Sequence, residues 1–74
     1  MDKYALAKVL GDMYTNSPDG ESVAMIHLFG IKYANEISKA ETSSSELIKL
    51  SGLSNSYSTE LSKGIKLSRY VQPK

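Results

Sequence analysis

The chain has 74 residues, a formal net charge of +1, 41% hydrophobic residues and no cysteine. A chain of this length forms one small domain, its composition excludes a disordered protein, and the lack of cysteine excludes disulfides and thiolate metal sites. The longest apolar run, within residues 23–29, is too short to span a bilayer, so we expect a cytoplasmic protein without membrane contact.

Two helices are predicted in the N-terminal half. Asp2 is the expected N-cap of a helix over residues 3–15, whose apolar residues repeat at intervals of three and four. After a turn around Pro18, a second helix should cover roughly residues 19–39. Its apolar residues are too many for one stripe, which indicates a central helix contacted on two sides. Gly30 marks either a kink or a close helix crossing, and both readings stay open here.

A third helix is predicted over residues 44–51. Ser43, followed three residues later by Glu46, has the form of a capping box. Gly52 ends this helix, and Leu53 should be buried between it and the next one.

A fourth helix should follow over residues 55–63, with Ser54 as its N-cap and Gly64 as the left-handed residue after it. Two short helices joined by a turn that contains glycine have the sequence form of a helix-turn-helix. Residues 65–74 are a short C-terminal arm, read as a helical turn, a strand or an extended segment, and Pro73 and Lys74 are expected to fray.

Charge is unevenly distributed along the chain. Residues 1–53 carry five lysines against seven acids, a net charge of −2, whereas residues 54–74 carry four basic residues against Glu60 alone, a net charge of +3. The net charge of +1 by itself predicts no partner, but the positive end of the chain begins with the fourth predicted helix.

Residues 46–64, ELIKLSGLSNSYSTELSKG, resemble the helix-turn-helix core of the Cro/repressor-type (xenobiotic-response-element-like) DNA-binding domains. Members often read E-L-A-x-L-S-G-L-S-x-S-Y, and the match here has no gap, although Ile48 and Ser58 depart from the family's small and aliphatic residues. The resemblance implies that helix 55–63 is the recognition helix that enters the DNA major groove, and that Tyr57 lies close to the DNA backbone. It also implies a small bacterial or phage transcriptional regulator.

Polar side chains around this helix are the candidate DNA contacts. The expected base contacts, which should lie near one another on the helix, are Asn55, Ser56, Thr59 and Lys63. The expected contacts with the DNA backbone are Ser44, Ser54, Tyr57, Lys66 and Arg69. The competing interpretation is that these serines and threonines are only caps and a solvated helix face.

Two further residues have a structural and a functional interpretation. Glu60 would repel phosphates, so we expect an intramolecular pair with a lysine rather than readout of a cytosine amino group. His27, the only histidine, should pack at the edge of the core, since no second histidine, cysteine or suitable carboxylate pair accompanies it. The sequence therefore predicts no metal, no cofactor and no enzymatic activity.

These observations together predict an all-α, four-helix domain over residues 1–74. Residues 1–39 would support the fold and form a homodimer interface, and residues 43–64 would form the helix-turn-helix. The predicted function is sequence-specific binding of double-stranded DNA as a dimer on an inverted repeat. The alternative is a protein-protein interaction module, a helical adaptor or anti-regulator, that retains the same geometry.

Overall fold

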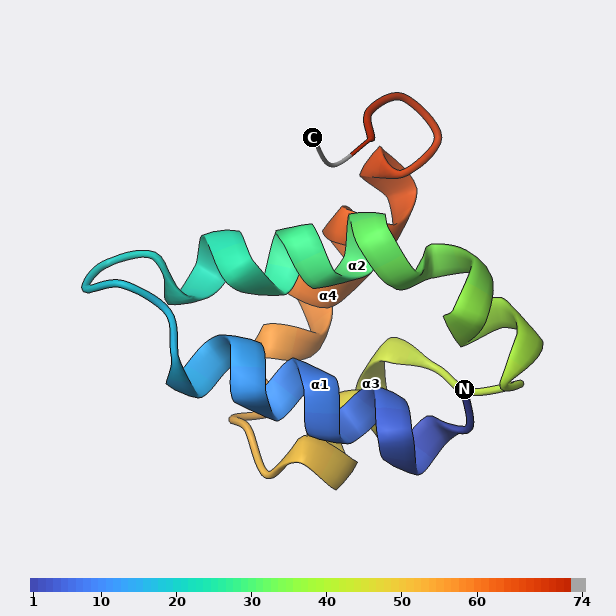
Figure 1. The fold of residues 1–74 in the computed structure, drawn as a ribbon, viewed down its shortest axis with the longest axis horizontal. Coiled ribbons are helices and arrows are strands. Elements are labelled where there is room, and N and C mark those ends of the chain that lie inside the picture. The colour runs from blue at the N-terminus through green and yellow to red at the C-terminus, as the bar shows by residue number, and fades with distance from the viewer. Residues whose placement is uncertain (73–74) are drawn as a thin grey trace.

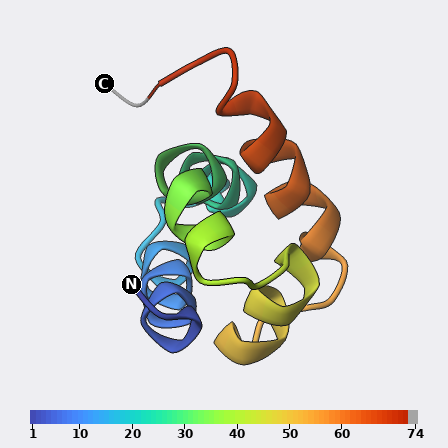
Figure 2. The same cartoon turned by 90° about the vertical axis from the view of Figure 1, so that its right-hand side faces the viewer.

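The computed structural model describes residues 1–72 and contains four helices over that range. They are α1 (Lys3–Thr15), α2 (Ser22–Lys39), α3 (Ser44–Ser51) and α4 (Tyr57–Leu67). Figure 1 shows α1 and α2 running antiparallel, with α4 crossing behind α2. In the perpendicular view of Figure 2, α1 and α2 form one layer and α3 and α4 form the other. The predicted all-α class is confirmed.

Each helix packs against two neighbours. α1 contacts α2 and α3, while α4 contacts α2 and α3. Between the layers lies one core to which every helix contributes, and its buried members are Leu6, Ala7, Leu10, Ile26, Phe29, Ile37, Leu47, Ile48 and Leu61. α2 is thus contacted on two sides, as its wide distribution of apolar residues predicts.

Side-chain and glycine caps define the helices that the sequence predicts best. The Asp2 carboxylate accepts a hydrogen bond from the Ala5 amide at 2.8 Å, and α1 has the predicted bounds. The Ser43 hydroxyl accepts from the Glu46 amide at 3.2 Å, and α3 also has its predicted bounds. Glu46 does not return a bond to Ser43, since its carboxylate accepts from Thr42 and Lys3.

The second helix begins later than predicted and bends at a different residue. Gly20 is left-handed, with φ of 79°, and the Glu21 amide donates to the Pro18 carbonyl, so residues 18–21 form a turn and α2 begins at Ser22. Non-helical backbone angles occur at Tyr33, not at Gly30. Gly30 instead marks a close helix crossing, where an added Cβ would lie 2.8 Å from the Ile65 nitrogen.

Gly64 was expected to end the fourth helix, and that expectation is wrong. It lies inside α4, buried against α2, where an added Cβ would lie 2.5 Å from the His27 carbonyl oxygen. Because Gly64 and Gly30 have no side chains, the backbones of α4 and α2 approach each other directly. The helix therefore continues to Leu67 and takes up the start of the expected C-terminal arm.

The connection between α3 and α4 covers residues 52–56. Gly52 is left-handed, and the amides of Gly52 and Leu53 donate to the carbonyls of Lys49 and Ile48, which forms a Schellman motif. Leu53 packs against the core but is only half-buried, which corrects its expected full burial. A turn over residues 68–70 follows α4, and residues 73 and 74 of the expected arm lie outside the described residues.

Candidate nucleic-acid interface

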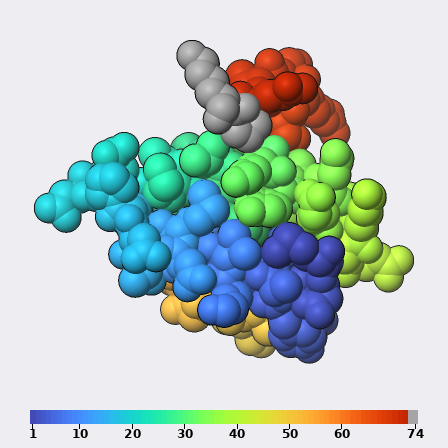
Figure 3. Space-filling model, in the orientation of Figure 1, coloured from blue at the N-terminus to red at the C-terminus, as the bar shows by residue number. Residues whose placement is uncertain are grey.

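One exposed stripe runs along α4 on the side away from the core. Thr59, Lys63 and Lys66 are exposed and follow one another at intervals of four and three, so they share one helix face. Leu61 and Gly64, on the opposite face, are buried. In Figure 3, the N-terminal half of the chain, in blue to green, covers most of the face shown, and Figure 2 places α3 and α4 in the other layer. The fold thus holds α4 by its apolar side and presents its polar side.

The cations at this end of the molecule differ in their partners. Lys63 Nζ lies 3.2 Å from Glu60 Oε1. Within residues 1–72, no ion pair joins Lys66 or Arg69 to an acid. Arg69 follows α4 in a turn, where its amide donates to the Lys66 carbonyl at 3.3 Å. Both side chains can therefore meet an anionic partner without first breaking an internal pair.

Two of the expected base contacts do not lie on the helix. Asn55 and Ser56 are exposed in the turn before α4, which corrects their expected place beside Thr59 and Lys63 on one helical face. The Tyr57 and Ser58 amides donate to the carbonyls of Ser54 and Asn55, so this turn is tighter than an α-helix. The prediction of Ser54 as the N-cap is therefore wrong: Ser56 holds that position without a side-chain cap hydrogen bond, and the Ser54 hydroxyl pairs with that of Ser56 at 3.1 Å.

Two of the side chains expected to contact the DNA backbone have hydrogen-bond partners inside the protein. Ser44 is half-buried and accepts a hydrogen bond from the Ser62 hydroxyl at 2.9 Å, which joins the start of α3 to α4. Tyr57 is half-buried, with its hydroxyl 3.3 Å from that of Tyr14 and the two rings edge to face. This hydrogen bond raises the pKa of Tyr14 above its ordinary value. Both contacts fix the position of α4 relative to the rest of the fold.

Glu60 links α4 to α2 through a pair that the sequence does not predict. The expected pair with a lysine is confirmed, because one carboxylate oxygen accepts from Lys63. The other oxygen lies 2.9 Å from Nε2 of His27, which is half-buried at the edge of the core as expected. The hydrogen bond from His27, and then the one from Lys63, lower the pKa of the Glu60 carboxyl.

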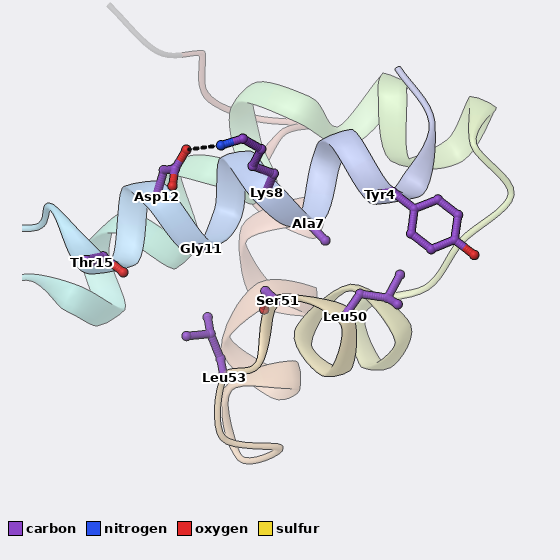
Figure 4. Close-up of a pocket in the computed structure, with 9 residues that line it drawn as sticks. All are labelled: Tyr4, Ala7, Lys8, Gly11, Asp12, Thr15, Leu50, Ser51 and Leu53. Carbon is purple, nitrogen blue, oxygen red and sulfur yellow. Dashed lines mark ion pairs between the residues drawn. The ribbon is translucent and has the colours of Figure 1, made fainter.

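A shallow groove separates α1 from α3. Figure 4 shows Tyr4 and Ala7 of α1 on one side and Leu50, Ser51 and Leu53 on the other. Tyr4 and Leu50 are exposed although they are largely apolar. Lys8 and Asp12 form an ion pair of 3.7 Å on α1, at the edge of the groove. The groove lies on helices that do not carry the exposed lysine stripe.

Neither a metal site nor a membrane-spanning helix occurs within residues 1–72. No group of three histidine, aspartate or glutamate residues there could hold a metal ion. In the same range, no helix has both the length and the apolar character needed to cross a bilayer.

A comparison with protein families matches residues 2–74 to a model described as an HTH-like domain. No curated protein and no solved structure matches the chain. The family match includes α1 and α2 as well as the helix pair, and it indicates a DNA-binding regulator in general without pointing to the Cro/repressor subtype. The chain belongs to the HTH-like domain family.

Proposed function

We propose that the protein is a transcriptional regulator that binds specific DNA sequences by placing α4 in the major groove. The exposed stripe of Thr59, Lys63 and Lys66 carries this proposal. A hydroxyl and two ammonium groups on one helix face can donate to base edges and phosphates, while the buried face of α4 fixes the orientation of the helix.

The flanking residues extend the proposed contact surface. Asn55 and Ser56, exposed in the turn, would meet the DNA at the start of α4, and Arg69 would meet a phosphate beyond its end. The DNA backbone would be contacted from the α3 side of the motif by Ser54, Ser44 and Tyr57. The family supports DNA binding in general, and these individual contacts are our proposal.

Selection from a random duplex library, followed by affinity measurements on the selected sequence, tests this function. Thr59→Ala should lose about 1–3 kcal/mol of specific binding with its melting temperature unchanged. Lys66→Ala and Arg69→Ala should weaken binding to all duplexes and flatten the salt slope by about one unit each. Lys8→Ala is the matched control, because Lys8 is exposed on α1 and does not belong to the exposed stripe of α4. Equal effects of Lys8→Ala and Lys66→Ala would contradict the assigned surface.

We also propose that the protein binds an inverted repeat as a homodimer through residues 1–39, since one recognition helix reads only half a site. Tyr4 and Val23 are the large apolar residues exposed on α1 and α2. Sedimentation with and without the selected duplex tests this, and a monomer in both samples would remove the dimer.

The groove between α1 and α3 favours a second candidate, a protein-protein interaction module. Tyr4 and Leu50 could receive an apolar segment of a partner protein. The two functions differ in salt dependence, because DNA binding weakens steeply as salt rises and an apolar contact does not. Partner binding that is lost in Leu50→Asp, with no enriched duplex, would favour this candidate.

A further inference from the structure

Glu60 occupies a position where a DNA-binding face would not be expected to keep a negative charge. It is the only acid after Glu46, and its carboxylate has one oxygen on His27 and the other on Lys63. The His27 and Glu60 side chains are 31% and 24% exposed, whereas that of Lys63 is 60% exposed. The three groups thus form a chain from the edge of α2 to the exposed stripe of α4.

We propose that the Glu60 carboxylate holds Lys63 back from DNA by pairing with it, and that protonation of His27 offsets the Glu60 charge, so that affinity for DNA rises as the pH falls. This inference rests on the proposed DNA-binding function. It assigns Glu60 and His27 to the regulation of the same surface, without direct contact between His27 and DNA.

The hydrogen bond keeps its geometry while its charge changes. A carboxylate only accepts hydrogen bonds, so Nε2 of His27 donates whether the ring is neutral or protonated. With a neutral ring the three groups have no net charge, because the Lys63 ammonium is balanced by the Glu60 carboxylate. With a protonated ring they carry one net positive charge, which draws phosphates to the exposed end of the chain.

Glu60 and Lys63 are the two charged side chains in the ion pairs around His27. α4 contributes those two groups to the cluster around His27. α1 also packs against α2, but its Lys8 pairs with Asp12 and its Lys3 pairs with Glu46. Since His27 is the only histidine in the chain, a pH effect that its substitution removes can be assigned to this one ring.

The experiment measures the affinity of the full chain for a mixed-sequence duplex of about 20 base pairs, at about pH 5.5 and 8 and constant ionic strength. Wild type should bind roughly three- to tenfold more tightly at the lower pH. His27→Gln keeps an N–H donor toward Glu60 but does not titrate, so its affinity should be nearly the same at both values. Equal pH dependence in wild type and His27→Gln overturns the proposal.

Glu60→Gln tests the restraint on Lys63 separately. It should bind more tightly than wild type at the higher pH, and this gain should shrink by at least half in a Lys63→Ala background, because Glu60 acts through Lys63. Asp12→Asn removes the same charge from α1 and should change affinity little. A Glu60→Gln gain that is unchanged without Lys63, or that Asp12→Asn reproduces, overturns the proposal. If His27→Gln loses its cooperative melt, His27→Asn, which also keeps an N–H donor and does not titrate, takes its place in the pH comparison. Absence of wild-type binding at both pH values would instead refute the proposed function itself.

Discussion

The close crossing of α2 and α4 predicts that replacing glycine by alanine has opposite effects on the free energy of unfolding at different glycines. Alanine at Gly64 would place a Cβ 2.5 Å from the His27 carbonyl oxygen, and alanine at Gly30 would place one 2.8 Å from the Ile65 nitrogen. Both obstacles are main-chain atoms, so no side chain can rotate away. We expect the two helices to move apart by nearly an ångström to restore ordinary contact distances.

The magnitude follows from two opposing terms. Overpacking of a core costs about 1–3 kcal/mol. A gap of up to ~1 Å between the helices also removes a quarter to a half of the attractive energy of each dispersion contact along the crossing. In the opposite direction, alanine stabilises a helix interior by about 1 kcal/mol relative to glycine. We therefore expect a net loss of about 1–3 kcal/mol at either glycine, which lowers the melting temperature of a domain of this size by roughly 4–24 °C.

Gly11→Ala is the matched control, because it also lies inside a helix. An added Cβ there would lie 3.8 Å from the Ser51 carbonyl oxygen, an ordinary contact distance, so Gly11→Ala should raise the free energy of unfolding by up to about 1 kcal/mol. Urea and thermal unfolding followed by circular dichroism at 222 nm measure all three variants. A Gly64→Ala protein as stable as Gly11→Ala would refute the backbone crossing.

Three further substitutions test the caps, the core and the ion pairs. Asp2→Ala removes the acceptor for the Ala5 amide and should cost about 1 kcal/mol in urea unfolding, whereas Asp19→Ala, in the turn before α2, should cost little. Leu61→Ala should cost about 2–5 kcal/mol because Leu61 is fully buried, and Leu53→Ala, at a half-buried residue, should cost clearly less; equal losses would contradict the burial pattern. Hydrogen bonds from Thr42 and then Lys3 hold the pKa of Glu46 below its ordinary 4.5, so the ionised carboxylate stabilises the fold above that pH. This stabilisation is lost as the pH falls through the lowered pKa. The melting temperature of Glu46→Gln should therefore fall less than that of wild type between about pH 6 and 3.

The sequence predicted the helices whose ends depend on local signals. α1 and α3 have their expected bounds because Asp2 and Ser43 accept from amides three residues on, and because Gly52 takes a left-handed conformation. Gly64 was misread because a glycine at a helix end and a glycine at a helix crossing look alike in a single sequence. Only the position of α2 against α4 distinguishes them.

The sequence predicted the part of the candidate site that depends on local spacing along one helix. The spacing of Thr59 and Lys63 predicts their shared helix face, whereas Lys66 was expected in the C-terminal arm and joins them because α4 continues to Leu67. Asn55 and Ser56, expected on the same face, lie in the turn before α4. The link between His27 and Glu60 joins residues that are 33 positions apart, and no local pattern encodes such a distance. A lone histidine and a lone acid within a basic segment were the available signals.

The ring of contacts among the four helices also determines what can be transplanted. α3 rests on α1 and α4 rests on α2, so the helix-turn-helix faces partners outside its own sequence. A segment cut at residue 43 would leave Leu47, Ile48 and Leu61 without most of the core they share with α1 and α2. Residues 43–72 alone are expected to show no cooperative melting transition by circular dichroism. A chimeric regulator would therefore have to inherit α1 and α2 together with the motif, or receive only the exposed residues of α4.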